Sequence, residues 1–281
     1  MATGPGMVWL ASYPKSGNTW FRLIVAHLAA GPGREPTINE AVRHSAFAAS
    51  RAAFEATTML DSDLLFSDDI DLLRPRLYDH IAADEGALWI KVHDAYSYLA
   101  DGQPMLGTAP GAAIYLVRDP RDVAISFAHF SNVSIDDSIA FLGSTGKTLG
   151  RDRFGGPTQL RQRLLDWSGH VESWTRQTCV PVLAVRYEDL SADPVTEVSR
   201  AMQFAGQDVL EDDVERAVAL TSFGELQRQE AELGFVEGPG ARPFFRSGRP
   251  GGWREILSRE QSRRVEDAHA AVMERFGYAR G

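Results

Sequence analysis

The chain has 281 residues, of which 44% are hydrophobic and 24% are charged, and its formal net charge at pH 7 is −9. This composition is ordinary for a globular protein with a sizeable core, and the acidic balance argues against a broad nucleic-acid-binding surface. Cys179 is the only cysteine, which excludes internal disulfides and cysteine-rich zinc sites and fits a reducing compartment.

No secretory signal is visible, and no apolar segment is long enough to span a bilayer. These features predict a cytoplasmic enzyme or binding protein with no membrane span.

The first predicted elements are a strand over Met7–Ser12 and a helix over about Asn18–Ala30. The turn between them reads Lys15-Ser16-Gly17-Asn18-Thr19. Free backbone N–H groups at a helix N-terminus, hydroxyl donors and a lysine all favour an anion, and glycine lets the backbone approach it closely. The turn therefore predicts a phosphate cradle. The alternative is a plain tight turn with a solvated lysine.

This turn is not a Walker A loop, because its lysine precedes the glycine. Residues 143–148 read Gly-Ser-Thr-Gly-Lys-Thr and look more like that motif. Their spacing is wrong by two residues and no predicted strand precedes them, so we interpret them as a flexible loop.

The second predicted strand covers Ala87–Val92 and is followed by His93. Lys91 and His93 lie two residues apart, so on a strand their side chains point the same way. A histidine at a strand end is by itself more often structural than catalytic.

The third predicted strand covers Ala112–Val117 and ends at Arg118, at the edge of the sheet where open α/β folds bind ligands. A helix starts at Asp119-Pro120, with Asp119 as cap. Ser126 lies in its second turn, where a serine is unhelpful unless its hydroxyl has a partner. These residues predict a second anion site, and the alternative is a surface arginine beside a tolerated serine.

A fourth predicted strand covers Val180–Arg186. Further helices start at Asp193-Pro194 and at Ser258, where Gln261 completes a capping box. The alternation of strands and helices predicts a three-layer α/β/α fold with a mainly parallel sheet. We expect one domain over residues 1–281. Lid or acceptor-binding insertions are expected near residues 31–85, 143–157 and 224–252.

The segment Phe245–Trp253 is rich in glycine and carries Arg246 and Arg249. This composition predicts a mobile flap over an anion, with a basic surface loop as the alternative.

Several of these motifs resemble the PAPS-dependent sulfotransferases, which use 3′-phosphoadenylyl sulfate. Residues 13–20, Tyr-Pro-Lys-Ser-Gly-Asn-Thr-Trp, resemble the family's 5′-phosphosulfate loop. Residues 118–130 resemble its 3′-phosphate motif, and residues 246–253 resemble its R-[KS]-G-x-x-G-x-W segment. Two smaller matches are Tyr187-Glu188-Asp189 and Thr221-Ser222-Phe223, which resemble segments that contact adenine. The matches occur in family order over nearly the whole chain.

The resemblance implies a P-loop-like nucleotide fold, PAPS as co-substrate and 3′,5′-ADP as product, with no metal. The acceptor would be a hydroxyl of an alcohol, phenol, lipid or natural product. Lys91-Val92-His93 resembles the family's K-[TV]-H segment, in which the histidine is the base, and Lys15 and Lys91 would neutralise the leaving oxygen. The implied nucleotide contacts are Lys15, Ser16, Gly17, Asn18, Thr19, Trp20, Arg118, Ser126, Tyr187, Thr221, Ser222, Phe223, Arg246, Ser247 and Gly248.

Two other functions remain open from the sequence. One is a P-loop nucleotide kinase or hydrolase that uses ATP and magnesium, for which Glu188-Asp189 would be the challenger for the Walker B role. The other is a binding module without turnover. The chain departs from the family where Gly252 replaces an aspartate, and residues 254–264 do not fit the family's dimer motif. The oligomeric state is therefore left open.

Overall fold

The computed structural model describes residues 6–83, 89–107, 111–150, 159–240 and 242–280. Its central sheet has five strands in the order β2-β3-β1-β4-β7, and every neighbouring pair is parallel. The strands are β1 Val8–Ser12, β2 Ala46–Phe47, β3 Trp89–Val92, β4 Ala112–Val117 and β7 Val182–Arg186. The four predicted strands are confirmed. Ala87, the predicted start of one of them, lies outside the described residues. The short edge strand β2 was not predicted.

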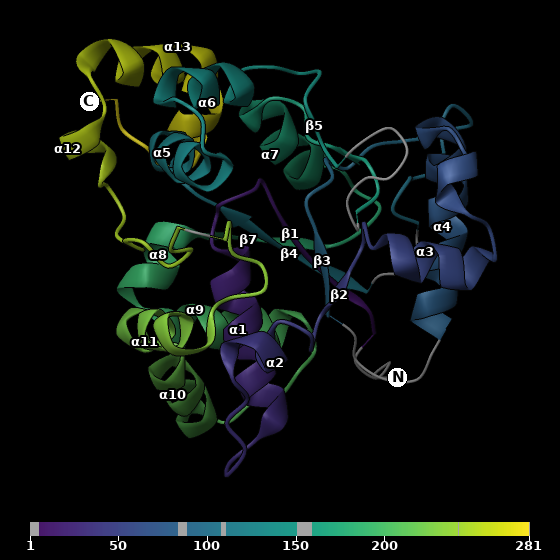
Figure 1. Cartoon of the computed structure of the whole chain (residues 1–281), viewed down its shortest axis with the longest axis horizontal. Helices are drawn as coiled ribbons and strands as arrows, with labels where there is room; N and C mark the ends of the chain where they lie inside the picture. The colour runs from purple at the N-terminus through teal and green to yellow at the C-terminus, as the bar shows by residue number, and fades with distance from the viewer. Residues whose placement is uncertain (1–5, 84–88, 108–110, 151–158, 241, 281) are drawn as a thin grey trace.

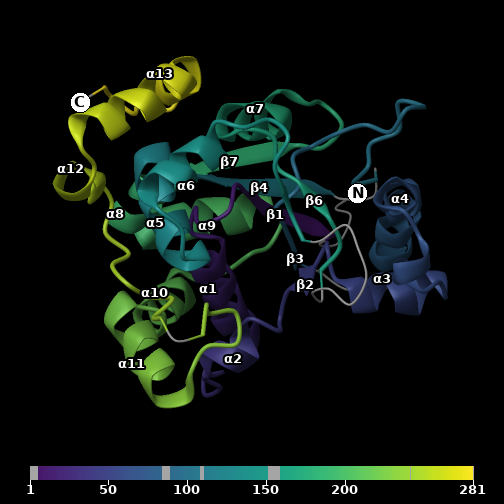
Figure 2. The same cartoon turned by 45° about the horizontal axis from the view of Figure 1, so that its top comes forward.

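The middle strand β1 is buried on both faces. Val8 and Leu10 belong to one apolar cluster, and Trp9 and Ala11 belong to another. Side chains alternate along a strand, so the continuous apolar run serves two cores at once. Helices cover both faces of the sheet, which gives the predicted three layers (Figures 1 and 2).

The helices divide between the two faces by the cluster they join. On the face of Val8 and Leu10 lie α1 Asn18–Ala30, α8 Tyr187–Ala192, α9 Pro194–Phe204 and α10 Glu211–Leu220. On the other face lie α5 Pro120–Ser131, α6 Ile135–Leu142, α7 Trp167–Arg176 and α13 Arg259–Arg275. The caps predicted at Asp119 and Asp193 and the capping box of Ser258 with Gln261 are all present.

The stretches predicted as insertions contain most of the remaining elements. Within 31–85 lie α2 Ile38–Ala41, β2, α3 Arg51–Thr58, the 3₁₀ helix η1 Ser62–Leu64 and α4 Ser67–Ala83. Residues 148–149 form β5 Thr148–Leu149, which pairs with β6 Gln162–Arg163, and residues 151–157 of that insertion lie outside the described residues. The last stretch contains most of α11 Phe223–Leu233, and α12 Trp253–Ile256 follows it. The Walker-like residues 143–148 follow helix α6 and not a strand, so they lack the strand that precedes a Walker A loop.

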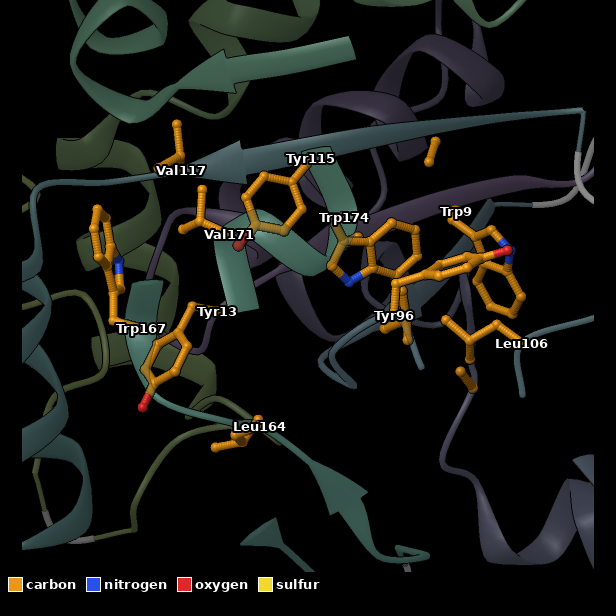
Figure 3. Packing of buried hydrophobic residues seen from close by; sticks show 14 of the residues in the cluster. Trp9, Tyr13, Tyr96, Leu106, Tyr115, Val117, Leu164, Trp167, Val171 and Trp174 are labelled. Atoms are coloured by element: carbon orange, nitrogen blue, oxygen red, sulfur yellow. The ribbon is translucent and has the colours of Figure 1, made fainter. Parts of the chain in front are cut away.

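Buried aromatic side chains pack on the sheet face that carries α5, α6, α7 and α13. Figure 3 shows Tyr13, Tyr115, Trp167 and Trp174 among them. The Trp174 indole N–H donates to the carbonyl of Asp94, 2.9 Å away, just after strand β3. This packing supports the strand ends and the residues that follow them.

Candidate active site

A cavity of about 900 Å³ opens where β1, β3 and β4 end. It brings together most of the residues predicted for the site from distant parts of the chain. Those that line it are Lys15, Gly17, Asn18, Thr19, Trp20, Lys91, His93, Arg118, Ser126, Tyr187, Phe223, Arg246, Ser247 and Gly248.

Three predicted residues do not line the cavity. Ser16 is buried, and its hydroxyl has no hydrogen-bond partner within the described part of the chain. Thr221 is also buried, and its hydroxyl donates to the carbonyl of Ala217 at 2.8 Å. Ser222 is exposed at the start of α11. Direct nucleotide contact by these three side chains stays a prediction.

The turn after β1 has the backbone of an anion cradle. Gly17 precedes α1 with φ of 100°, and no side chain caps the helix. A Cβ at Gly17 would lie 2.6 Å from the Tyr187 ring, so both conformation and space require glycine. Asn18 ties the turn to β1 by donating its amide to the Leu10 carbonyl at 2.9 Å. The N–H groups of the first helical turn have no partner within the helix and are free to meet an anion in the cavity.

Lys15 carries its ammonium into this cavity between two aromatic rings. Its Nζ lies 4.2 Å from the ring centroid of Phe130 and 3.9 Å from that of Phe244. Burial, followed by the charges of Arg118 and Lys91, lowers the pKa of Lys15 to about 7. An anion bound here would favour the protonated lysine, so ligand binding and lysine charge are coupled.

His93 is held in the tautomer that a general base requires. Its Nδ1 lies 2.9 Å from the carbonyl oxygen of Ser12, which can only accept, so Nδ1 carries the proton and Nε2 carries the lone pair. Burial, and then the charge of Lys91, lowers the pKa of His93 to about 3. The ring is therefore neutral at ordinary pH.

A second histidine supports the backbone of the first. The buried His170 donates from Nε2 to the carbonyl of His93 at 3.0 Å, and the Tyr115 hydroxyl donates to its Nδ1 at 2.8 Å. Burial lowers the pKa of His170 to about 4, so this chain of hydrogen bonds stays uncharged. Sequence reasoning missed His170, because nothing in its helix marks it as a neighbour of β3.

Arg118 connects the turn to the flap. Its Nη1 donates to the Lys15 carbonyl at 3.2 Å, its guanidinium lies 4.3 Å from the Tyr187 ring centroid, and its buried Nε has no partner in the described chain. The Tyr187 hydroxyl donates to the carbonyl of Gly248. Arg118 therefore has hydrogen-bond donor capacity left for an anion. It lines the same cavity as the other residues predicted to bind the 3′-phosphate.

Asp122 holds the flap, a role that sequence reasoning missed. Its carboxylate accepts from the backbone N–H groups of Gly251 at 2.6 Å and Trp253 at 2.9 Å. The neighbouring Arg121 is buried and pairs with Asp119 and with Glu266 of α13. The stretch that resembles the 3′-phosphate motif thus contributes one cavity arginine, Arg118, and one structural arginine.

Glu237 is a further lining residue that was not predicted. Its carboxylate accepts from Arg22 of α1 and lies 3.5 Å from the Nζ of Lys91. The available signal was Arg22 itself, the one Lys, Arg, Asp or Glu residue in a mostly apolar helix.

Glu188, one of the two residues considered for a Walker B role, makes hydrogen bonds outside the cavity. It accepts from the backbone N–H of Asp119 at 3.0 Å and from the Tyr278 hydroxyl at 2.8 Å. Glu188 does not line the cavity. This placement removes the main structural argument for a kinase-like site.

Comparison with known proteins identifies the family. The model of the sulfotransferase domain family matches residues 5–277, so the chain belongs to this family. The chain is 25% identical to cytosolic sulfotransferase 17 of Arabidopsis thaliana, with 93% of this chain and 72% of that protein covered. It is 24% identical to sulfotransferase 1B1 of Mus musculus, with coverage of 96% and 83%. The prediction of a sulfotransferase is confirmed.

Solved structures agree on the fold. A retinol dehydratase complexed with androsterone and the inactive cofactor PAP matches with a TM-score of 0.62 and 18% identity, covering 97% of this chain and 82% of that one. Mouse sulfotransferase SULT7A1 complexed with PAP matches with a TM-score of 0.60 and 20% identity, covering 98% and 86%. The predicted P-loop-like α/β/α fold is confirmed.

Proposed function

We propose that this sulfotransferase transfers the sulfuryl group of PAPS to a hydroxyl of an acceptor and releases 3′,5′-ADP. The observation that carries the proposal is the placement of His93 in the same cavity as the anion cradle and Arg118, with no hydrogen-bond partner for its Nε2 among the described residues. A kinase or hydrolase that uses ATP and magnesium would leave His93 and Arg118 without a role. The family match also favours the sulfotransferase.

The cavity lining suggests how the nucleotide lies. The 5′-phosphosulfate would occupy the turn at residues 15–19, against the N-terminus of α1. The 3′-phosphate would bind Arg118 and Ser126 and the flap residues 246–248. The adenine would lie among the aromatic side chains of Trp20, Tyr187 and Phe223.

The chemistry follows from where charge develops. His93 Nε2 takes the proton of the acceptor hydroxyl as its oxygen bonds to sulfur. The bond between sulfur and the 5′-phosphate oxygen breaks in line, and that oxygen gains negative charge. Lys15 and Lys91 neutralise this charge. Because their interaction with it is strongest in the transition state, it lowers the barrier. The proposal includes no metal ion, because these cations would meet the developing charge.

The acceptor is proposed to be an apolar alcohol, phenol, lipid or natural product. Phe47, Phe130, Leu149 and Phe244 line the cavity together with His93. An apolar wall beside the base favours a largely hydrophobic ligand whose hydroxyl reaches it. Retinol dehydratase, a relative in fold, has been solved in complex with androsterone and in complex with retinol, both of them apolar alcohols.

No helix of the described residues is both long and apolar enough to cross a membrane. A cytoplasmic location is proposed from the lone cysteine and from the name of the Arabidopsis relative. The chain is proposed to act as a single domain, with the acceptor walls supplied by the insertions near 31–85, 143–157 and 224–252. The oligomeric state stays open, because residues 254–264 do not fit the family's dimer motif.

The acceptor class is tested by incubating the protein with PAPS and two matched panels of alcohols and phenols, one apolar and one charged. Mass spectrometry follows the sulfated products. We expect sulfation within the apolar panel and little in the charged one. Preferential sulfation of charged acceptors would contradict the proposed acceptor class.

A further inference from the structure

Glu237 is anchored from the side of α1. Arg22 is only 3% exposed, and its Nη1 donates to both carboxylate oxygens of Glu237 at 3.0 and 2.9 Å. The rest of the guanidinium is also engaged: Nε donates to the Ser45 hydroxyl and Nη2 to the Val42 carbonyl, each at 2.6 Å. A planar guanidinium held on three sides is a rigid support. The position of the Glu237 carboxylate is therefore set by the helix behind the cavity.

Lys91 is the second cation on the same carboxylate. Its Nζ lies 3.5 Å from Oε2 of Glu237 and 4.9 Å from the ring centroid of Phe47. This ion pair is longer than the one with Arg22, and the lysine stem can rotate whereas the arginine is locked. Lys91 is thus the movable partner, and Glu237 is the fixed one.

The charge of Glu237 acts on all three proposed catalytic groups. Burial lowers the pKa of Lys91, of Lys15 and of His93, and Glu237 opposes this by raising each of the three. Burial alone would raise the pKa of Glu237, but Lys91 and Arg22 together outweigh it and lower this pKa to about 2, so Glu237 is an anion at any ordinary pH. Among the described residues, the charged and titratable groups that act on Lys91 are Arg22, Lys15, Glu237 and His93, and those that act on Lys15 are Arg118, Lys91, Glu237 and Glu230.

We infer that Glu237 is a positioning residue for sulfuryl transfer: fixed by Arg22, its carboxylate orients Lys91 as an ion-pair partner before the donor binds. This inference rests on the proposed function. The donor's anions then replace Glu237 as the partner of Lys91, and Lys91 is released toward the leaving oxygen.

Replacing the charge should change binding in opposite directions at the two ends of the pH range. In Glu237→Gln the lysines lose their protons at lower pH, so 3′,5′-ADP should bind more weakly at alkaline pH. At acidic pH both lysines are charged with or without Glu237, and the variant lacks a carboxylate that repels the phosphates. There it should bind the nucleotide more tightly than the wild type. The two affinity curves should cross.

The experiment is calorimetric titration with 3′,5′-ADP between about pH 5 and pH 9, for wild type and variants whose melting curves show that they are folded. We expect the alkaline loss of affinity to move down by about one pH unit in Glu237→Gln. Glu237→Asp keeps a more distant charge, so its shift should have the same direction and be smaller. If the glutamine variant does not fold, the aspartate variant decides the question.

Asn39→Ala is the matched control for a disturbance of the loop that carries Glu237. Asn39 accepts from the N–H of Val236 and donates to the carbonyl of Gly234, so its loss loosens the loop without changing its charge. Its affinity curve should keep the wild-type pH dependence. Parallel curves for wild type, Glu237→Gln and Glu237→Asp would overturn the inference. A wild type that does not bind 3′,5′-ADP at all would instead overturn the proposed function.

Discussion

His93→Ala should lower the turnover of PAPS by about a hundredfold to ten-thousandfold, the usual contribution of a positioned general base. The reason is local: Nδ1 is committed to the Ser12 carbonyl, which leaves Nε2 as the proton acceptor. The loss should appear in kcat, while the affinity for 3′,5′-ADP changes little. Steady-state kinetics with a sulfated acceptor, beside calorimetry with the product nucleotide, separates the two effects.

His80→Ala serves as the control, because His80 is exposed on α4 and does not line the cavity. It should keep wild-type kinetics. Because the pKa of His93 is lowered to about 3, protonation of the base should not limit kcat/KM until the pH is well below the ordinary histidine value of 6.5. Near-normal turnover in His93→Ala would show that another group removes the acceptor proton.

Lys15→Ala should lower turnover by about a hundredfold or more, because one lost donor to a developing oxyanion typically costs about 3–4 kcal/mol of barrier. The lysine's lowered pKa adds a pH signature. As the pH rises through about 7, the free enzyme loses the Lys15 proton and with it a partner for the donor's phosphate. The wild-type kcat/KM for PAPS should therefore fall on the alkaline side, as a pH–rate profile would show.

Lys147→Ala is the matched control for Lys15→Ala. Lys147 belongs to the Walker-like residues 143–148, is exposed, and does not line the cavity. Its loss should leave turnover unchanged. The reverse pattern, with Lys147 essential and Lys15 dispensable, would contradict this assignment, because it would place the phosphate site at residues 143–148.

Much of the fold could be predicted from local signals. Continuous apolar runs identified β1, β3, β4 and β7, and the caps at Asp119, Asp193 and Ser258 located three helix starts. Local chemistry determines these features, so they need no knowledge of distant contacts. The strand β2 has only two residues, Ala46 and Phe47, and forms because β3 offers an edge for pairing. No local pattern encodes such a pairing.

The candidate site divides in the same way. Lys15, Gly17, His93 and Arg118 follow strand ends, and parallel strands bring their carboxyl ends to one edge of the sheet. Glu237 lies 146 residues from Lys91 along the chain, and only the folded loop joins them. Residues that support the site from afar therefore had to come from the structure.

His170 and Asp122 illustrate the same limit. Each acts through a backbone group, the carbonyl of His93 in one case and the N–H groups of Gly251 and Trp253 in the other. Backbone partners leave no trace in residue type, so the sequence could show only that a histidine and an aspartate were present. The position of the base and of the flap depends on both.

The central claim is that the cavity holds an adenine nucleotide with a 3′-phosphate on Arg118. Calorimetric titration of the wild type with 3′,5′-ADP, and separately with ATP and magnesium, tests it most directly. We predict binding of 3′,5′-ADP that Arg118→Ala weakens by about tenfold to a hundredfold, since a hydrogen bond to a charged group contributes about 1.5–3 kcal/mol. Arg186→Ala, at the end of the neighbouring strand β7 and outside the cavity lining, should bind as the wild type does. Binding of ATP with magnesium but not of 3′,5′-ADP would contradict the account.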